Sequence, residues 1–328
     1  MITLSKEVFH GRYDNKELSL VAYEQLVETC YNYFILILLT WRTGFCSLST
    51  FSSTKDNPIL SAVETFQRME AILLVGVVLA AGYGTRLSEF SGAKHKCLVP
   101  LNGVCLIDYN LDLLKRLDVE RIVIVVGYNR GYVEKHVGTS YKGTPVVYAI
   151  QEPPRGVADA LRCALPAIGG APFFMCLADE LLFAPTFHRL KEAFRRPEAA
   201  GVCGVVKSDQ TRITKAYTLD LDEKNEILRV LEKPRPEEIF NEYQGTGYCL
   251  IGQALARLLQ ETPPNAVRGE YEMCDWFTVG LASGLRLFAA EVAEENVNIN
   301  TREDLLRAGE LMKGDYHEAE AKHRDALS

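Results

Sequence analysis

The chain has 328 residues, of which 48% are apolar and 24% are charged, and its formal net charge is -7. These values are those of an ordinary globular protein, long enough for one large α/β domain or two small ones. Because the charge balance is acidic, we expect neither a nucleic acid nor an anionic membrane as a partner. A small anionic substrate remains compatible, since Arg86, Lys94, His95 and Lys96 form a local basic cluster.

The nine cysteines are odd in number and include no Cys-x-x-Cys pair. Most of them stand inside apolar runs, which is typical of reduced core thiols. We therefore predict a cytoplasmic protein, and the cysteine spacing does not support a zinc site.

Residues 1–70 differ from the rest of the chain. Their most apolar run, 31–41, has eleven residues, whereas a membrane-spanning helix needs about 20. The run lies too far from the terminus for an ordinary signal peptide. We predict a buried or interfacial helix and no membrane span. Since Met69 shortly precedes the first core strand, we treat residues 1–70 as an extension of unknown role, either helical or a start upstream of the native one.

The next segment joins a buried strand to a glycine loop. Residues 75–79 are apolar without alternation, the pattern of a parallel strand covered on both faces. Gly82 and Gly84 let the backbone bend and present its N–H groups to an anion, while Arg86 and Lys96 supply positive charge. The segment therefore predicts a binding site for a triphosphate-like anion.

Two known phosphate motifs do not fit this loop. A dinucleotide fingerprint needs a third glycine where Leu87 stands, and a Walker loop needs four residues between its glycines and then Gly-Lys-Ser/Thr. The remaining alternative is a glycine-rich turn without a ligand, because such turns occur in most α/β proteins.

Helical and strand patterns alternate after the loop. The periodicity predicts strands over 121–126, 145–150 and 172–177 and helices over 106–117, 132–136 and 157–164. This alternation is typical of an α/β fold with a doubly wound, mostly parallel sheet that binds ligands at the carboxyl ends of its strands. Strand patterns dominate later, over 201–206, 216–221, 227–232 and 245–251.

The strand-rich part suits an added mixed-sheet layer that closes over a second substrate. We place one domain at 71–315 and an acidic C-terminal tail, read as a solvated helix end, at 316–328.

Polar residues follow several of the predicted strands. Asp179 could hold a hard cation or cap the next turn. Gln151 offers a donor and an acceptor that can read the edge of a uracil or thymine, and the N–H of Gly156 can reach the other carbonyl, although such a pair is more often only a turn. Lys233 could neutralise a phosphate, and Glu232 could bind sugar hydroxyls, although most such exposed pairs are simply solvated.

Taken in order, these segments resemble the sugar-1-phosphate nucleotidyltransferases, or nucleotide-sugar pyrophosphorylases, and in particular the glucose-1-phosphate thymidylyl- and uridylyltransferases. The matching motifs are Leu-Ala-x-Gly-x-Gly-Thr-Arg-Leu with a lysine ten residues past its arginine, Gln-x-Pro-x-x-Gly-x-Ala, Leu-x-Asp, Glu-Lys-Pro and a closing Asn-rich motif, at 79–96, 151–158, 177–179, 232–234 and 296–305. The resemblance covers about 73–311 and implies a Rossmann-like, GT-A-like nucleotidyltransferase fold.

The resemblance also implies a role for each matching residue. It assigns nucleotide binding to Leu79, Ala81, Gly82, Gly84, Thr85, Gln151 and Gly156. It assigns the catalytic charges to Arg86, Lys96, Asp179 and Lys233. It assigns the sugar phosphate to Glu232, Lys233, Gly247 and Glu270, and Mg²⁺ to Asp179 and Asn298.

Asn298 departs from the aspartate that many members have, although some members resembling the N-acetylglucosamine-1-phosphate uridylyltransferases have asparagine. An amide oxygen is an acceptable magnesium ligand that brings no charge. Asn298 can also shape a turn ahead of a helix capped by Thr301, with Asp304 completing a capping box.

The activity implied is transfer of a nucleoside monophosphate from UTP or dTTP to a sugar 1-phosphate, with release of pyrophosphate and formation of an NDP-sugar. Two alternatives stay open: a CTP-dependent cytidylyltransferase acting on phosphocholine or a phosphonate, and a non-catalytic, ligand-sensing subunit of a nucleotidyltransferase assembly. Exposed apolar helices and the 31–41 run make a homo-oligomer plausible.

Overall fold

The computed structural model describes residues 74–84 and 92–325, with side chains described as far as Lys313. The predicted extension over 1–70 lies outside the described residues, and so do Thr85 and Arg86. All described residues belong to one unit of the chain, Ile72–Ser328.

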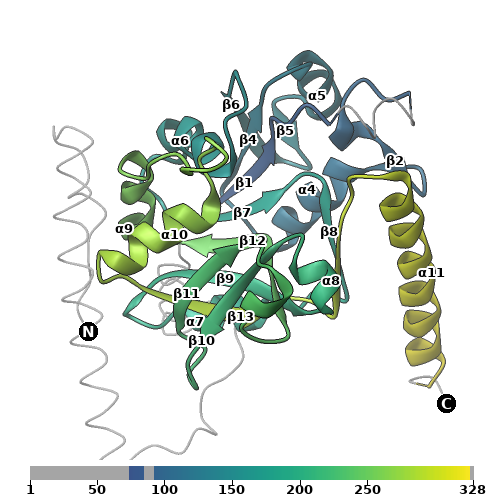
Figure 1. Cartoon of the computed structure of the whole chain (residues 1–328). Coiled ribbons are helices and arrows are strands. Elements are labelled where there is room, and N and C mark those ends of the chain that lie inside the picture. The colour runs from purple at the N-terminus through teal and green to yellow at the C-terminus, as the bar shows by residue number, and fades with distance from the viewer. Residues whose placement is uncertain (1–73, 85–91, 326–328) are drawn as a thin grey trace, which may run out of the picture. The chain divides into compact units, whose positions relative to one another are not determined.

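Four parallel strands form the centre of the sheet. They are β1 (Val75–Ala80), β4 (Arg121–Val126), β6 (Thr144–Ile150) and β7 (Phe173–Leu177), in the order β6-β4-β1-β7 (Figure 1). The chain runs outward from β1 to β6 and then returns to the other side of β1. This reversal makes the carboxyl ends of β1 and β7 a topological switch point, where α/β sheets bind their ligands.

The later strands continue the same sheet beyond β7. Strand β7 pairs antiparallel with β12 (Tyr243–Ile251), and β12 pairs with both β9 (Ala199–Lys207) and β10 (Tyr217–Leu221). The sheet is completed by β11 (Ile227–Glu232) beside β10, β13 (Arg286–Glu291) beside β9 and β5 (Ser140–Tyr141) beside β6. The predicted α/β fold with a largely parallel central sheet is confirmed, and its mixed part is joined to it through β12.

Helices cover both faces of the sheet. Val77 and Leu79 of β1 pack in one apolar cluster with residues of α6, α9 and α10, whereas Val78 packs in a second cluster with residues of α4, α5 and α7. Alternate residues of a strand point to opposite faces, so every residue of β1 is buried. These helices span Val157–Ile168, Gln253–Arg257, Met273–Ala282, Leu106–Arg116, Arg130–Val137 and His188–Phe194, in the order named.

A third, smaller cluster lies around two short antiparallel pairs. One pair is β8 (Glu180–Phe183) with β14 (Glu295–Asn298), and the other is β2 (Pro100–Leu101) with β3 (Val104–Cys105). Helix α11 (Arg302–Asp325) begins against this cluster through Ala308. In the β14–β8 pair, Asn298 lies opposite Glu180. This pairing places the end of β14 beside the end of β7. The remaining short elements are η2, α8, η3 and η4, at Lys96–Leu98, Gln210–Ile213, Pro236–Glu238 and Leu258–Gln260.

The described residues also bear on the membrane and cysteine predictions. None of the helices in the described ranges combines the length and apolar character needed to cross a membrane. The seven cysteines among the described residues are all free thiols, as expected for reduced core cysteines.

Candidate active site

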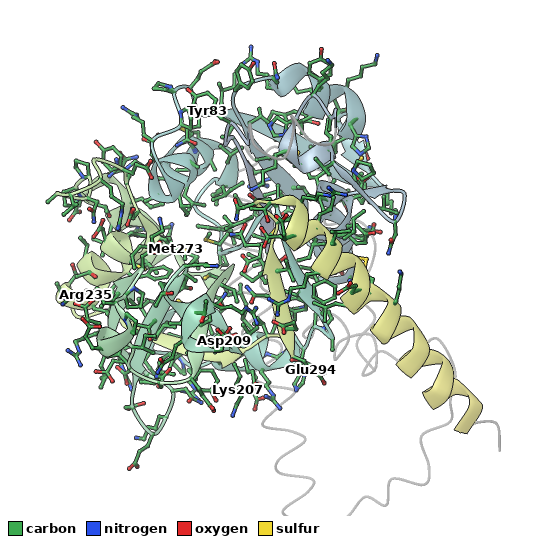
Figure 2. The ribbon with its side chains drawn as sticks, turned by 45° about the vertical axis from the view of Figure 1, so that its right-hand side comes forward. Tyr83, Lys207, Asp209, Arg235, Met273 and Glu294 are labelled. Atoms are coloured by element: carbon green, nitrogen blue, oxygen red, sulfur yellow. The ribbon has the colours of Figure 1, made fainter. Side chains whose placement is uncertain are left out.

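The glycine loop after β1 packs directly on a lysine stem. Gly84 has φ +55°, and a Cβ at this position would overlap Cβ of Lys96. Only glycine therefore permits both the left-handed backbone and the close approach. Figure 2 labels Tyr83, which lies in this loop and whose ring meets that of Tyr128 edge-on at a centroid distance of 5.7 Å. The loop backbone and the Lys96 side chain thus form one surface.

Lys96 connects the glycine loop to the end of β7. Its ammonium group forms an ion pair with the carboxylate of Asp179 and donates to Oδ1 of Asn300 at 2.8 Å. The amide of Asn300 in turn donates to Oδ1 of Asn298 at 2.9 Å. The N–H of Ile299 donates to the backbone carbonyl of Asp179 at 2.8 Å, which holds the two segments together. The structure therefore brings together three predicted site residues, and Asn300 is an addition.

The ligands in this cluster suit a hard divalent cation. Asp179 and Asn298 each offer a side-chain oxygen as a ligand, and the Asp179 side chain is 26% exposed. Magnesium prefers oxygen ligands and is commonly bound through one or two carboxylates together with waters and substrate phosphates. The residues present therefore fit the predicted Mg²⁺.

The segment that carries Asn298 and Asn300 ends in a helix cap. Oδ2 of Asp304 accepts the N–H groups of Asn300 and Thr301 at 2.9 and 2.8 Å, and Oγ1 of Thr301 accepts the N–H of Asp304 at 3.2 Å. The predicted capping box is confirmed, and it also holds the backbone of the residue that contacts Lys96.

Replacing Asp304 by alanine will lower the free energy of unfolding by about 1 kcal/mol, because two backbone N–H groups lose their acceptor. Urea denaturation followed by circular dichroism measures this change. The neighbouring, exposed Glu303 provides the control, and Glu303→Ala should leave the midpoint unchanged. Equal midpoints for the two variants would contradict the capping role.

Glu180 is a buried carboxyl group directly below the cluster. It is 2% exposed, and it accepts the N–H of Gly247 at 2.8 Å and the side-chain amide of Asn296 at 2.6 Å. Burial raises the pKa of Glu180 to about 7, and the negative charge of Asp179 adds to this rise, whereas the two hydrogen bonds oppose it. Glu180 thus ties β8 to β12 and to β14.

The predicted base-reading pair lies at the end of β6. Gln151 is buried, and its Nε2 donates to the carbonyl of Gly156 at 3.0 Å and to Oδ2 of Asp159 at 2.8 Å. Gly156 has φ +105°, and a Cβ there would overlap the carbonyl oxygen of Tyr271. The structure therefore brings Gln151 and Gly156 together in a turn that only glycine can complete.

The two ends of the site are separated by the width of three strand spacings. Gly127 follows β4 and lies between the glycine loop and Gln151. A Cβ at this position would lie 3.0 Å from the carbonyl oxygen of Ala81 and 2.6 Å from that of Gln151. The order of strand ends is therefore Asp179, the glycine loop, Gly127 and Gln151. At about 4.8 Å per strand, the row spans about 14 Å.

The predicted second-substrate residues lie at the end of β11. Lys233 has φ +48°, a left-handed conformation that is uncommon outside glycine. Glu232 accepts a hydrogen bond from the thiol of Cys274 at 3.2 Å. Burial raises the pKa of Glu232, and the negative charge of Glu272 raises it further.

The turn before α10 joins this region to the base-reading loop. The N–H of Tyr271 donates to the carbonyl of Arg155 at 2.7 Å, and its carbonyl accepts the N–H of Ala158 at 2.9 Å. Glu270 is exposed in this turn, whereas Glu272, two residues later, is buried and forms an ion pair with Arg268. Glu272 and Arg268 were not predicted, because the Gly-Glu-Tyr-Glu sequence alone does not tell which glutamate turns inward.

Three further predicted residues are packed away from solvent. Leu79 and Ala81 are buried at the end of β1. A Cβ on Gly247 would overlap Cγ of Leu177 and lie 2.6 Å from Oε2 of Glu180. Gly82, by contrast, is exposed, and a Cβ there would meet nothing within 4 Å.

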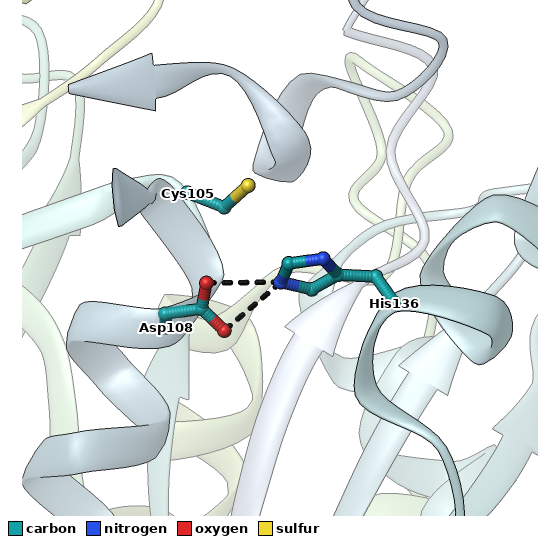
Figure 3. Close-up of side chains that lie close together, drawn as sticks. All are labelled: Cys105, Asp108 and His136. Carbon is teal, nitrogen blue, oxygen red and sulfur yellow. Dashed lines mark hydrogen bonds and ion pairs between the residues drawn. The ribbon is translucent and has the colours of Figure 1, made fainter. Parts of the chain in front are cut away.

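One cluster in the described part of the chain combines other metal-binding side chains. Cys105, Asp108 and His136 lie close together (Figure 3). Nε2 of His136 lies 2.9 and 3.0 Å from the two carboxylate oxygens of Asp108, and the Cys105 thiol donates to the carbonyl of Leu98 at 3.5 Å. These groups bond one another or the backbone, and we assign no metal to them.

The structure places Lys96, Asp179 and Asn298 at the switch point of an α/β sheet, where such sheets bind their ligands. A family model described as nucleotidyl transferase matches residues 75–294. The chain therefore belongs to the nucleotidyl transferase family, as predicted, and is a nucleotidyltransferase.

The chain is 28% identical over 243 residues to the UTP–glucose-1-phosphate uridylyltransferase AglF of Haloferax volcanii, with 74% of this chain and 98% of AglF covered. It also matches bifunctional GlmU proteins, of which it spans about half the length, for example 50% of the Thermus thermophilus protein at 32% identity.

Two solved structures share the fold. A UDP-glucose pyrophosphorylase complexed with UDP-glucose has a TM-score of 0.66 at 19% identity, covering 74% of this chain and 99% of that one. The inositol-1-phosphate CTP transferase from T. maritima has a TM-score of 0.61 at 23% identity, covering 74% and 96%. At these identities the likeness concerns the fold alone, and it does not choose between nucleotides.

Proposed function

We propose that this nucleotidyltransferase transfers a uridylyl or thymidylyl group from UTP or dTTP to a sugar 1-phosphate and releases pyrophosphate. The observation that carries the proposal is the row of strand ends, with Lys96, Asp179 and Asn298 at one end and Gln151 at the other. The similarity to AglF, whose name specifies UTP and glucose 1-phosphate, supports this choice of substrates.

The nucleotide lies along this row with its phosphates on the glycine loop. Backbone N–H groups from Gly82 onward and the predicted Arg86 hold the leaving pyrophosphate, while Lys96 lies near the α-phosphate. Thr85 is part of the same loop in the sequence. Preorganised cations of this kind stabilise the charge that develops during phosphoryl transfer. Magnesium, held by Asp179 and Asn298, would supply further neutralisation of the phosphates.

The sugar 1-phosphate approaches from the β11 side. Lys233 neutralises its phosphate, and Glu232 and Glu270 bind its hydroxyl groups, with Gly247 in the strand below. The attacking phosphate oxygen is already ionised, so the reaction needs no general base; an oxygen–phosphorus bond forms at the α-phosphorus as the bond to pyrophosphate breaks. Binding in the correct orientation is then the main contribution of these residues.

We further propose, from the sequence, that the protein is cytoplasmic, as its reduced cysteines suggest, and forms a homo-oligomer. The chain would then consist of an extension over 1–70, a catalytic domain over 71–315 and a tail over 316–328.

Pyrophosphate release with glucose 1-phosphate, MgCl₂ and each of UTP, dTTP, CTP, ATP and GTP tests the activity. We expect UTP or dTTP to give the highest kcat/KM. The full chain is compared with a chain that starts at Met69, and equal activities would show that the extension is dispensable. A preference for CTP, with phosphocholine replacing the sugar phosphate, would overturn the proposal in favour of a cytidylyltransferase. Absence of turnover with every NTP would favour a ligand-sensing subunit.

A further inference from the structure

The side-chain amide of Gln151 can adopt only one orientation. Its nitrogen faces the carbonyl oxygen of Gly156 at 3.0 Å and Oδ2 of Asp159 at 2.8 Å. A backbone carbonyl only accepts hydrogen bonds, and an ionised carboxylate likewise only accepts. Turning the amide over would set its oxygen against two other acceptors. The surroundings therefore determine which atom is nitrogen.

The carboxylate of Asp159 also accepts hydrogen bonds from a second neighbour, Arg155. Arg155 donates from Nη2 to Oδ1 at 2.9 Å and from Nε to Oδ2 at 3.3 Å. A guanidinium group has only donors, so both carboxylate oxygens of Asp159 act as acceptors. Asp159 is 2% exposed, on the first turn of α6, which fixes it in place.

The amide oxygen is consequently the only part of the Gln151 amide that is left for a ligand. Both hydrogens on Nε2 are used by Gly156 and Asp159. Within the described residues, the sole buried side-chain N or O atom without a partner is Nε2 of His95. Oε1 of Gln151, which has no hydrogen-bond partner there, therefore retains access to solvent, and it can only accept.

An acceptor in this position discriminates between pyrimidines. When N3 of the base lies opposite Oε1, uracil and thymine donate their N3 hydrogen to it, whereas N3 of cytosine carries a lone pair and is repelled. A missing or opposed hydrogen bond at a buried polar group lowers affinity by about 10- to 100-fold.

We infer that Asp159 is a positioning residue that makes the site select UTP or dTTP over CTP, by fixing the Gln151 amide with its oxygen toward the base. Arg155 supports this role by holding the carboxylate. The inference rests on the proposed function, since it concerns the same nucleotide site.

Asp159→Asn tests the inference with minimal change of shape. In this variant the oxygen of the introduced amide stays on the side of Arg155, because a guanidinium group can only donate hydrogen bonds. The NH₂ group of the same amide therefore faces Gln151. This new NH₂ group opposes Nε2 of Gln151, whereas the carbonyl of Gly156 still favours it. The Gln151 amide is therefore no longer fixed, and a fraction of the molecules present a hydrogen to the base. We expect the ratio of kcat/KM for UTP to kcat/KM for CTP to fall by about tenfold or more, through a higher KM for UTP and a gain with CTP. The KM for glucose 1-phosphate should stay within about twofold, because Asp159 acts only through Gln151.

Two further variants complete the experiment. Asp112→Asn is the matched control, because Asp112 lies in an exposed ion pair with Lys142 at 2.5 Å, on α4; it should keep the wild-type ratio. Arg155→Met leaves the carboxylate but releases its support, and the ratio should fall by about threefold. The Arg155 side chain is 57% exposed, so this variant tests the inference even if Asp159→Asn fails to fold.

The outcomes separate the inference from the proposed function. A wild-type chain that selects UTP or dTTP, together with variants at Asp159 and Arg155 that keep the same UTP-to-CTP ratio, would overturn the inference and leave the proposed function standing. Loss of kcat by the same factor with every nucleotide would show a merely structural role and would also overturn it. A wild-type chain that prefers CTP would overturn both.

Discussion

Asp179→Asn will lower kcat by about 10²- to 10³-fold at saturating magnesium and substrates, as for the loss of other preorganised charge stabilisers. Asp179 stands at the carboxyl end of β7 and forms an ion pair with Lys96. The substitution keeps the shape of the side chain but removes its charge, so Lys96 loses its anionic partner and the proposed magnesium site loses its carboxylate. Pyrophosphate release under single-turnover and steady-state conditions measures the effect.

Asp108→Asn is the matched control for this prediction. Asp108 lies outside the row of strand ends, where both of its carboxylate oxygens contact Nε2 of His136. It should retain turnover within about twofold of the wild type, the range expected for a surface pair. Near-normal turnover of Asp179→Asn in saturating magnesium would show that the mechanism proposed above is wrong.

Gly247→Ala will lower the free energy of unfolding by about 3 kcal/mol, at the upper end of the usual cost of overpacking a core. The added methyl group would overlap Cγ of Leu177 and lie 2.6 Å from Oε2 of Glu180. Glu180 cannot move away easily, because both of its carboxylate oxygens accept hydrogen bonds. Urea denaturation followed by circular dichroism and tryptophan fluorescence measures the loss.

Gly131→Ala provides the comparison. Gly131 lies in α5, and a Cβ there would meet nothing within 4 Å. Alanine favours helix over glycine by about 0.8–1.0 kcal/mol, so this variant should be at least as stable as the wild type. If the two glycine variants lost the same stability, close packing around Gly247 would not be the cause.

Much of the fold was predictable because its strands are continuous apolar runs. The predicted bounds 121–126 and 227–232 coincide with those of β4 and β11. Helix α6 extends four residues beyond its predicted end at Ala164, although Pro166 lies within it. A proline inside a helix removes one i→i−4 hydrogen bond and crowds the preceding turn, and this helix ends two residues after Pro166, at Ile168. The left-handed Gly169, whose N–H donates to the carbonyl of Leu165, ends this helix.

The contacts that complete the site were less accessible from the sequence. Lys96 and Asn300 are 204 positions apart, and they meet because β14 pairs with β8 and the N–H of Ile299 bonds the carbonyl of Asp179. The inward position of Glu272, in place of the exposed Glu270, depends on the backbone bonds that Tyr271 makes with the loop around Arg155. Motifs identify residue types at separate places in the chain, whereas these arrangements depend on strand register and tertiary hydrogen bonds.

The row of four strand ends has an evolutionary consequence. Because Gln151 follows β6 and Asp179 follows β7, two other strands stand between the proposed base-recognition residue and the residues proposed to act on phosphate. Residues that are about 14 Å apart and share no partner contribute nearly independently. Substitutions in the turn after β6 can therefore change which nucleotide is consumed while the reacting end stays intact, so a lineage with this fold can acquire new donor specificities one loop at a time.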